Sequence, residues 1–575
     1  MTPTLHFFGD AYDADITPGA QPEIRVRVRG RDVLALRVAS GVDADGRFDV
    51  AATALRREVR ETAAGLELTW RGKTALWPEI VIRARFGREG VRYGYTIRGR
   101  GAIDRARFGA DGSTRSRAVH HVLWSPEPTG DQTARFTPGE RAVVSVSSDK
   151  TFHLGHWFFT PPPFAFALGA SDDAWLMAGV LSRTERSNFT ELEAAAGDGL
   201  SLALVYDGHE RVDGEWRSPE LAFLPAPDPY AGLAAYCELL RAEGLAPSAV
   251  GEPPPAWWLE PIFCGWGEQC VVADARATDV LTTRAADHAT QANYESFVAT
   301  LEAKGVVPGT LVIDDKWQAT YGGNEPDATK WPQLARFIAA QHRRGRRVLL
   351  WLKAWDPEGL GADECVLDAE GKRIAADPTT PAYVERVRSS VRRMLVELGA
   401  DGFKLDFTHK IPTAGRTRGG ISGLALMHAY VALLHDAMRR VRADALLLGH
   451  AAHPAFEGIV DMVRLNDVPR VLGQPKSYLA AMEHRACIAR AALPGCPIDT
   501  DNWPSPDRAS FLEYVREQGR IGVPSLYYTT RIRWRSGDEP WVDEELRAED
   551  FAAIRQAWSA YRAARPHLTP VAALA

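Results

Sequence analysis

The residues of this chain best suited to chemistry are a lysine and an aspartate two positions apart, in the segment Phe403-Lys-Leu-Asp-Phe407. Successive side chains of a β-strand point to opposite faces. In a strand, Lys404 and Asp406 would share one face, and Leu405 and Phe407 would point to the opposite one. An ammonium group beside a carboxyl group keeps that carboxyl ionised, as a nucleophile requires. The segment therefore predicts a nucleophilic carboxylate at Asp406, with a purely structural ion pair as the alternative.

Carboxyl, aromatic and cationic residues also follow other apolar runs of the C-terminal half. A single Asp in such a position is often only a turn former or a helix cap, so none of them is informative alone. Together they suit a carbohydrate site, because aromatic faces pack on sugar C–H groups and carboxylates accept hydrogen bonds from sugar hydroxyls. The candidate binding residues are Trp266, Asp314, Asp315, Trp317, Trp351, Lys353, Trp355, Lys404 and Arg464.

These residues need a frame that brings the ends of several strands together. After residue 256, short apolar runs alternate with helical patterns, which is typical of a (β/α)8 barrel, an α/β fold whose active site lies at the carboxyl ends of its strands. We expect strands at Pro261–Trp266, Thr310–Asp315, Arg347–Trp355, Asp401–Phe407, Leu446–Ala451, Met462–Asp467, Pro497–Trp503 and Ser525–Thr530. We expect helices at Tyr294–Lys304, Leu334–Arg344, Tyr383–Leu398, Leu424–Val441, Lys476–Ala492, Arg508–Gln518 and Phe551–Ala563.

The first part of the chain has a different pattern. Apolar and polar residues alternate with a period of two, as in Glu23-Ile-Arg-Val-Arg-Val-Arg29, and clusters of Gly, Asp and Pro separate the runs. This pattern predicts a large antiparallel β-sandwich over residues 1–228. A helix and a proline-rich linker, Gly251-Glu-Pro-Pro-Pro255, would occupy residues 229–256, and the TIM barrel residues 257–575.

The order of three segments resembles the catalytic barrel of glycoside hydrolase family 36, the α-galactosidase group. These segments are Ile313-Asp-Asp315, Phe403-Lys-Leu-Asp-Phe407 and Val460-Asp-Met-Val-Arg-Leu-Asn-Asp467. The wider clan of retaining α-glycosidases includes families 27 and 31. The resemblance covers about residues 258–530, and the β-rich N-terminal part matches the β-sandwich of that family.

The resemblance implies a retaining, exo-acting α-glycosidase with a small-molecule carbohydrate substrate and no cofactor. It implies that Asp406 is the nucleophile and Asp467 the general acid/base, with Asp461 as a fallback at the wrong end of its strand. Lys404 and Arg464 would hold substrate hydroxyls, Asp314 and Asp315 would bind ring hydroxyls, and Trp351 would wall the pocket. A retaining glycosidase needs two carboxyl groups about 5–5.5 Å apart, one ionised and one protonated. The sugar itself and the choice between hydrolysis and transglycosylation stay open.

The same rim also carries an excess of cations: Lys316, Lys353, Lys404, His409, Lys410 and Arg464. A cation opposite a carboxylate or sulfonate forms strong charge-assisted hydrogen bonds, so one hypothesis is an anionic sugar. The alternative is that several of these cations point to solvent or pair with Asp314, Asp356 and Glu358, which are equally close in sequence.

Other classes of function are excluded or kept as alternatives by composition. The chain has 575 residues and a net charge of −6, which gives no electrostatic footprint for nucleic acid. No apolar run approaches the ~20 residues of a membrane helix. The first residues have neither a basic region nor a long apolar region, so we expect no secretory signal and a cytoplasmic protein. His450 and His453 lack a third ligand of suitable spacing, so no metal is expected. A Schiff-base lyase at Lys404 and a non-catalytic sugar-binding barrel are the competing functions; homo-oligomer formation stays open.

Overall fold

The computed structural model of the chain describes residues 3–19, 21–51, 55–110, 117–118, 122–126, 133–134, 141–147, 161–196, 200–248, 253–273, 283–465, 467, 478–534 and 542–565. Residues 251–252 of the predicted linker and residues 476–477 of a predicted helix lie outside this part of the chain.

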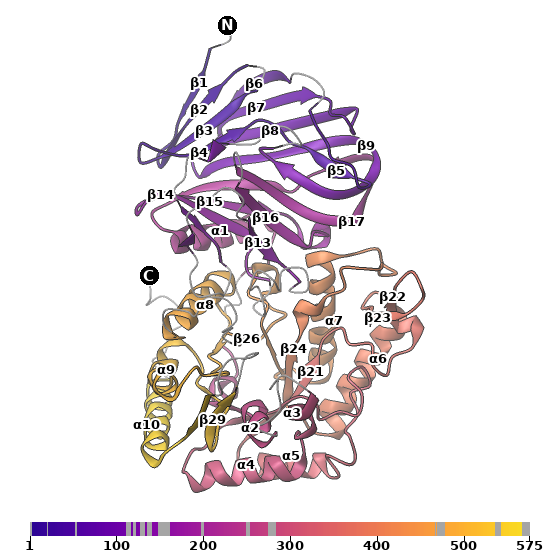
Figure 1. Ribbon diagram of the computed structural model, residues 1–575, viewed down its shortest axis with the longest axis vertical. Helices are drawn as coiled ribbons and strands as arrows, with labels where there is room; N and C mark the ends of the chain where they lie inside the picture. The colour runs from indigo at the N-terminus through magenta and orange to yellow at the C-terminus, as the bar shows by residue number, and fades with distance from the viewer. Residues whose placement is uncertain are drawn as a thin grey trace.

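The N-terminal part of the chain folds into antiparallel sheets, as the period-two alternation predicts (Figure 1). A five-stranded sheet has the order β1-β2-β3-β4-β10, and its β3 and β4 pack on β14 and β15 of a thirteen-stranded sheet. The core between the sheets includes the buried rings of Trp70, Trp77 and Tyr93. The strands are β1 (Leu5–Phe8), β2 (Tyr12–Thr17), β3 (Glu23–Val28), β4 (Arg31–Arg37), β5 (Val42–Ala44), β6 (Arg56–Thr62), β7 (Gly65–Gly72), β8 (Glu79–Gly87), β9 (Gly90–Phe108), β10 (Arg117–Ala118), β11 (Val122–Trp124), β12 (Thr133–Ala134), β13 (Arg141–Ser145), β14 (Ala165–Ser171), β15 (Ala174–Leu181), β16 (Glu191–Ala196), β17 (Leu200–Arg217) and β18 (Glu220–Ala226).

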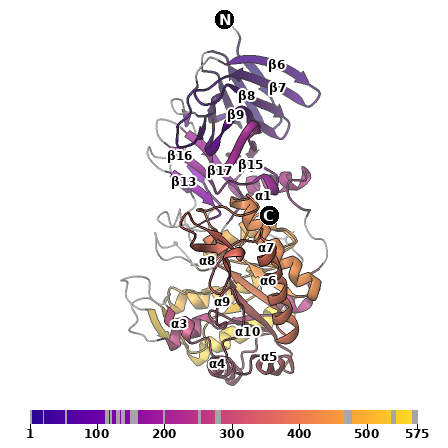
Figure 2. The same ribbon diagram turned by 90° about the vertical axis from the view of Figure 1, so that its right-hand side faces the viewer.

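Helix α1 (Pro229–Ala242) lies between the sandwich and the barrel (Figures 1 and 2). Asp228 caps its first turn by accepting hydrogen bonds from the backbone N–H groups of residues 230 and 231. On the sandwich side, the Tyr236 hydroxyl donates to the Val180 carbonyl at 2.6 Å. On the barrel side, Arg241 donates to the carbonyls of Ala491 and Ala492. The helix that was expected to begin a linker is thus packed against both domains.

The C-terminal part is an eight-stranded parallel barrel, as predicted. Its strands are β19 (Ile262–Cys264), β20 (Thr310–Ile313), β21 (Arg347–Lys353), β24 (Gly402–Asp406), β25 (Leu446–Gly449), β26 (Met462–Arg464), β27 (Ile498–Asp499) and β28 (Ser525–Leu526). They pair in the order β27-β26-β25-β24-β21-β20-β19-β28. A bridge between Asp499 and Val523 closes the remaining gap. All eight predicted strands occur, each shorter than expected because the carboxyl-end residues turn away into loops.

Helices surround the barrel on its outside. They are α2 (Trp266–Val272), α3 (Thr283–Asp287), α4 (Gln291–Ala303), α5 (Leu334–His342), α6 (Pro381–Arg392), α7 (Gly423–Val441), α8 (Tyr478–Ala492), α9 (Arg508–Ile521) and α10 (Ala548–Ala564). The seven predicted helices correspond to α4–α10. The features that were not predicted include the short helices α2 and α3 after β19, the hairpin of β22 (Cys365–Leu367) with β23 (Arg373–Ala376), and the hairpin of β29 (Arg531–Trp534) with β30 (Val542–Glu545).

The sandwich caps the first turn of α7, the helix that follows the strand carrying Asp406. The carbonyl of Phe189 accepts from the N–H of Leu424 at 3.2 Å, and the carbonyl of Ser187 accepts from the N–H of residue 425 at 2.9 Å. The Asn188 side chain accepts from the N–H of Ser422. The first N–H groups of a helix have no partner within the helix, so the sandwich supplies partners that α7 itself lacks.

Within the described residues, no helix is both long and apolar enough to cross a membrane. The six cysteines are free thiols.

Candidate active site

The predicted Lys404–Asp406 face points into the barrel. Lys404 lies on β24, and its Nζ donates to Asp314 Oδ2 at 2.7 Å across the barrel interior. The thiol of Cys264, at the end of β19, donates to the same carboxylate oxygen at 3.0 Å. Burial opposes the charge on Lys404, but the Asp314 carboxylate outweighs this effect and raises the pKa of Lys404 above its usual value. The base of the site therefore holds a fully buried ammonium–carboxylate pair.

Asp406 lies at the end of β24, where several donors converge on its carboxylate. Trp351 Nε1 donates to Oδ2 at 3.2 Å, and the Phe407 N–H donates to Oδ1 at 2.8 Å. Arg464 Nη2 lies 3.4 Å from both oxygens, and His450 Nε2 lies 3.7 Å from Oδ1. Burial opposes ionisation, but the charges of Arg464 and Lys404 outweigh it, and the pKa of Asp406 lies well below its usual range. Asp406 is thus an ionised carboxylate at neutral pH.

Asp467 shares Arg464 with Asp406. Arg464 Nη1 lies 3.2 Å from Asp467 Oδ1, so one guanidinium bridges the two candidate catalytic carboxyl groups. Burial raises the pKa of Asp467 to about 7. The Arg464 charge acts in the opposite direction, and the negative charges of Asp501 and Asp406 offset part of its effect. Two carboxyl groups whose environments push their pKa values apart are the physical basis for separate nucleophile and acid roles.

Asp461, the alternative acid, belongs to the opposite end of the barrel. Its carboxylate pairs with Arg439 and accepts from the Leu447 N–H at 2.8 Å, at the beginning of β26. This placement agrees with the expectation that it lies at the wrong end of its strand.

Asp315, next to Asp314 in sequence, contacts Tyr321 beside the rim residues Lys353 and Trp351. The Tyr321 hydroxyl donates to Asp315 Oδ1 at 2.9 Å. Burial raises the pKa of Asp315 to about 7. The hydrogen bond from Tyr321 lowers this pKa, and the neighbouring Asp314 charge raises it further. The Tyr321 ring lies 4.2 Å from Lys353 Nζ and 5.9 Å from the Trp351 ring. Tyr321 was not among the predicted residues, since it comes from the loop after β20 and only the fold places it here.

Four of the six predicted rim cations, Lys316, Lys353, Lys404 and Arg464, contact carboxylates. Lys316 Nζ lies 2.8 Å from Glu358 Oε2, and Lys353 Nζ lies 2.8 Å from Asp356 Oδ2. Arg464 and Lys404 have the partners described above. His409 is buried, and burial followed by the nearby charge of His450 lowers its pKa well below the usual value, so it is neutral at pH 7. The alternative to an anion site, that the cations pair with nearby carboxylates, therefore holds for these four residues, and Lys410 is exposed.

The predicted tryptophans fall into two groups. Trp351 contacts Asp406, and Trp266, half-buried, lies 6.0 Å from the Trp503 ring at the barrel rim. Trp317 is fully buried and donates to the Trp351 carbonyl. Trp355 is also buried, donates to the Thr408 carbonyl and packs 4.3 Å from the Tyr430 ring of α7. Trp317 and Trp355 thus pack in the wall behind the rim.

Phe407 does not point toward the helices, as strict alternation along β24 predicted. It has a φ of 59°, which ends the strand and breaks the alternation. Its ring lies 6.0 Å from the Trp351 ring and 5.4 Å from both the His409 ring and Lys353 Nζ. Phe407 is therefore a residue of the rim.

Among the described residues, no group of three or more His, Cys, Asp or Glu side chains is arranged to hold a metal ion. His453 instead packs its ring 5.8 Å from Phe164 of the sandwich.

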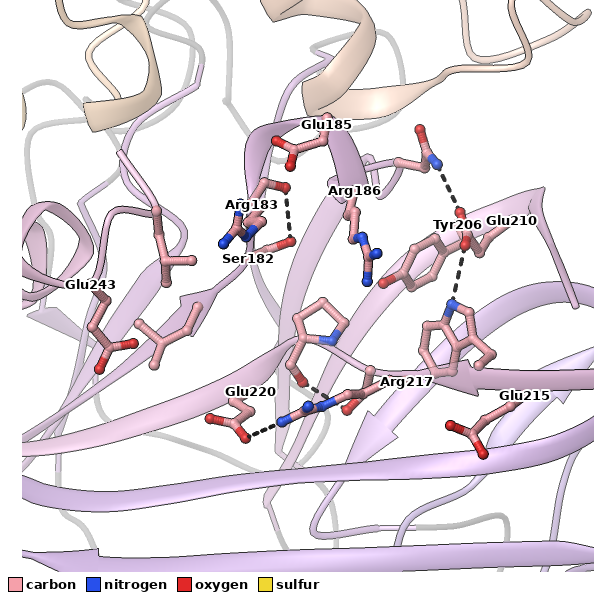
Figure 3. Close-up of a pocket in the computed structure, with 16 residues that line it drawn as sticks. Ser182, Arg183, Glu185, Arg186, Tyr206, Glu210, Glu215, Arg217, Glu220 and Glu243 are labelled. Carbon is pink, nitrogen blue, oxygen red and sulfur yellow. Dashed lines mark hydrogen bonds and ion pairs between the residues drawn. The ribbon is translucent and has the colours of Figure 1, made fainter. Parts of the chain in front are cut away.

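A separate hollow of about 490 Å³ lies on the sandwich (Figure 3). Its polar residues largely bind one another: Glu210 accepts from Asn188 and Trp216, and Arg217 pairs with Glu220. It contains none of the predicted site residues.

Comparison with known proteins adds information on the fold. No protein-family model and no curated protein matches the chain. The chain resembles solved structures along most of its length. One is an α-galactosidase from Thermus thermophilus in complex with stachyose, with 17% identity over 87% of this chain and 99% of that one, at a TM-score of 0.51. Another is a sulfoquinovosidase of family GH31 from E. rectale in complex with an aza-sugar inhibitor, with 12% identity over 98% and 83% and a TM-score of 0.57. A third is a cycloalternan-degrading enzyme from Trueperella pyogenes, with 13% identity over 88% and 83% and a TM-score of 0.52. The chain has the sandwich-and-barrel fold of these proteins.

Proposed function

We propose that the chain is a retaining, exo-acting α-glycosidase, with α-galactosides as the substrates to test first. The observation that carries the proposal is the pair of carboxyl groups on Arg464: the pKa of Asp406 lies well below its usual range, and that of Asp467 is raised to about 7, so that Asp467 keeps its proton below neutral pH. Double displacement requires this division of protonation. The fold shared with α-glycosidases of several specificities supports the same class of reaction.

In the proposed reaction, an Asp406 oxygen attacks the anomeric carbon while the bond to the leaving oxygen breaks. Asp467 gives its proton to that oxygen, so the aglycone leaves as a neutral alcohol. Water then attacks the anomeric carbon of the glycosyl-enzyme, the Asp467 carboxylate takes a proton from the water, and the bond to Asp406 breaks. Two inversions at one carbon give a product with the original α configuration.

A neutral sugar fits the rim better than an anionic one. An anionic substituent would need an unmatched cation, whereas Lys316, Lys353, Lys404 and Arg464 each have a carboxylate partner. Asp315 and Trp351 stand beside Asp406 as an acceptor and an aromatic wall for sugar hydroxyls and ring carbons. The competing reading, a sugar-binding protein without turnover, offers no reason for the opposed pKa shifts of Asp406 and Asp467.

Schiff-base chemistry at Lys404 is disfavoured by its ion pair. A nucleophilic lysine must be deprotonated, which a lowered pKa achieves. The Asp314 carboxylate at 2.7 Å has the opposite effect on the Lys404 pKa.

The test begins with a screen of aryl α-glycosides, galactose first, with the anomeric configuration of the first product followed by NMR. We expect retention of configuration in the wild type and loss of turnover in Asp406→Ala. Azide or formate should partly restore the variant and give the inverted product, because the anion occupies the place of the missing carboxylate. Binding without turnover in the wild type would contradict the proposal, and so would an Asp406→Ala variant that keeps most of its activity.

A further inference from the structure

A third carboxyl group contacts Arg464. Asp501 lies just beyond β27 and is fully buried. Its Oδ2 accepts from Arg464 Nη1 at 2.9 Å, a shorter distance than those from this guanidinium to Asp467 (3.2 Å) and Asp406 (3.4 Å). The Tyr527 hydroxyl donates to the same oxygen at 3.2 Å. Oδ1 accepts from the backbone N–H groups of Asn502 and Trp503 at 2.6 and 2.9 Å.

The three carboxyl groups on Arg464 differ in how many donors they receive. Asp501 accepts from four donors, the environment of an ionised carboxylate. Asp406 accepts from Trp351, the Phe407 N–H and Arg464. For the Asp467 carboxyl, the described part of the chain offers one donor, Arg464 Nη1, which Asp501 holds more closely.

The charges explain which group keeps a proton. Arg464 carries one positive charge, and the charge of Lys404 is matched at close range by Asp314. Two carboxylates, Asp406 and Asp501, already exceed the single charge on Arg464. A second buried cation near Asp467, Arg485, donates its Nη1, within the described part of the chain, to the backbone carbonyls of Leu465 and Asp467 and not to the Asp467 carboxyl. A third negative charge at Asp467 would be buried with one shared donor, which is costly in a low-dielectric site.

We propose that Asp501 is a positioning residue whose carboxylate holds Arg464 Nη1 and keeps the neighbouring Asp467 protonated, so that Asp467 can act as the general acid. The proposal rests on the glycosidase function proposed above. Asp501 itself touches neither substrate nor reacting atoms in this scheme; it acts through Arg464 and through its charge.

Several other titratable groups act on Asp467 and Asp501 and enter the design of the test. On Asp467 these are Arg464, Arg485, Asp406 and Lys404, in addition to Asp501 itself. On Asp501 they are Arg464, Tyr527 and Asp499, and Tyr478, Arg485 and Tyr514 also interact electrostatically with it. Asp499 is the natural control. It lies two residues earlier, at the end of β27, and accepts from Ser525 and from the Asp501 N–H. In the described part of the chain no hydrogen bond joins its side chain to Arg464, which acts on it only through its charge.

The test compares pH profiles of kcat/KM on a substrate with a poor leaving group. In the wild type, activity requires protonated Asp467, so it should fall as pH rises through about 7, the pKa of Asp467. Asp501→Asn keeps an oxygen for the Asn502 and Trp503 N–H groups but removes the charge. The pKa of Asp467 should then fall, and the alkaline limb should move down by one pH unit or more, which is about a tenfold loss at pH 8 with little loss at pH 5.

The controls separate charge from structure. Asp499→Asn and the charge-retaining Asp501→Glu should keep the alkaline limb of the wild type. An Asp501→Asn profile with the limb unmoved, or with an equal loss at every pH, overturns the proposal. A wild type that cleaves no glycoside instead overturns the proposed function, so the two failures are distinguishable.

A second variant covers the case in which Asp501→Asn does not fold, as judged by thermal unfolding. Tyr527→Phe leaves the Asp501 carboxylate but removes one of its donors, so Asp501 draws more strongly on Arg464 Nη1 at the expense of Asp467. The alkaline limb should then move in the opposite direction, to higher pH. A limb that stays in place in Tyr527→Phe overturns the proposal as well.

Discussion

At the scale of single residues, the contrast between Asp406 and Asp467 comes from their donors rather than from burial. The two side chains are exposed to a similar small extent, 12% for Asp406 and 14% for Asp467, and both contact Arg464. Asp406 also receives the Trp351 and Phe407 N–H groups and lies near Lys404 and His450. Burial raises a carboxyl pKa unless hydrogen bonds and positive charges compensate. Hydrogen bonds and positive charges outweigh the effect of burial on the pKa of Asp406, but not on the pKa of Asp467.

A leaving-group series tests the role that this contrast implies for Asp467. Asp467→Ala should slow substrates with poor leaving groups by about 10²–10⁴-fold, the usual contribution of general acid catalysis. Activated aryl glycosides need little protonation and should lose far less. Steady-state rates over a series of aglycone pKa values measure the difference.

The control for this series is Asp461→Ala, which removes a carboxyl group from the same strand at the other end of the barrel. It should leave the dependence on aglycone pKa as in the wild type. Equal losses on good and poor leaving groups in Asp467→Ala would contradict the acid role.

Sequence patterns predict the residues of the site better than their contacts. The alternation along a strand correctly placed Lys404 inside the barrel, where it meets Asp314. It failed at Phe407, because a left-handed residue ends the alternation and no local pattern announces it. Asp501 lies near the end of a predicted strand, Pro497–Trp503, but its role depends on Arg464, 37 positions away in sequence, and on Tyr527, just beyond β28. Such convergence is a property of the closed barrel.

At the scale of elements, α7 is the helix whose position depends most directly on the other domain. Gly423, its first residue, has a φ of 56°, a conformation that favours glycine. A Cβ at this position would collide with the Phe189 carbonyl, the same carbonyl that caps the helix. The close approach of these two segments of the chain therefore requires glycine.

Gly423→Ala should lower the free energy of unfolding by more than the about 1–3 kcal/mol typical of a strained backbone residue, because it also separates the sandwich from α7. Gly420→Ala is the matched control. Gly420 has a φ of 71° in the same loop, but open space surrounds the position of its Cβ, so only the backbone strain remains. Chemical denaturation of both variants measures the difference, and equal losses would contradict the interdomain contact as a source of stability.

The elements themselves were largely predictable. Seven barrel helices and eight strands follow from the alternation of apolar runs with amphipathic segments. Helix α2 was not predicted, because Trp266-Gly-Glu continues the apolar end of β19 and resembles a strand end. Its Glu268 is buried and accepts from the Thr529 and Thr530 N–H groups beyond β28, a tertiary contact that a local pattern does not contain.

At the scale of the whole molecule, the sandwich lies against the loops that surround the candidate site. His209 binds the Thr413 carbonyl and Arg416 binds the Gly208 carbonyl, both in the loop after β24. Phe164 packs on His453, in the segment after β25. The sandwich thus supports the segments that follow two strands of the site.

The charge pattern of the molecule predicts how salt affects catalysis. The net charge is −6, and the rim cations Lys316 and Lys353 are matched by carboxylates. We expect kcat/KM for a neutral α-glycoside to change less than about twofold between low and high salt, and to exceed that for an anionic analogue. A preference for the anionic substrate that weakens as salt is added would contradict the pairing and restore the anionic-sugar hypothesis.

The capping of α7 by the sandwich also bears on how such enzymes can be recombined. If two related enzymes were recombined at the segment between α1 and β19, each chimaera would receive an intact barrel. Its α7 would then be capped by the sandwich loop of the other enzyme. The unit to exchange is instead discontinuous: residues 182–190 must be exchanged together with residues 408–441, because they form the cap of α7. Chimaeras built on that pair of segments should retain their fold where those cut at the domain boundary do not.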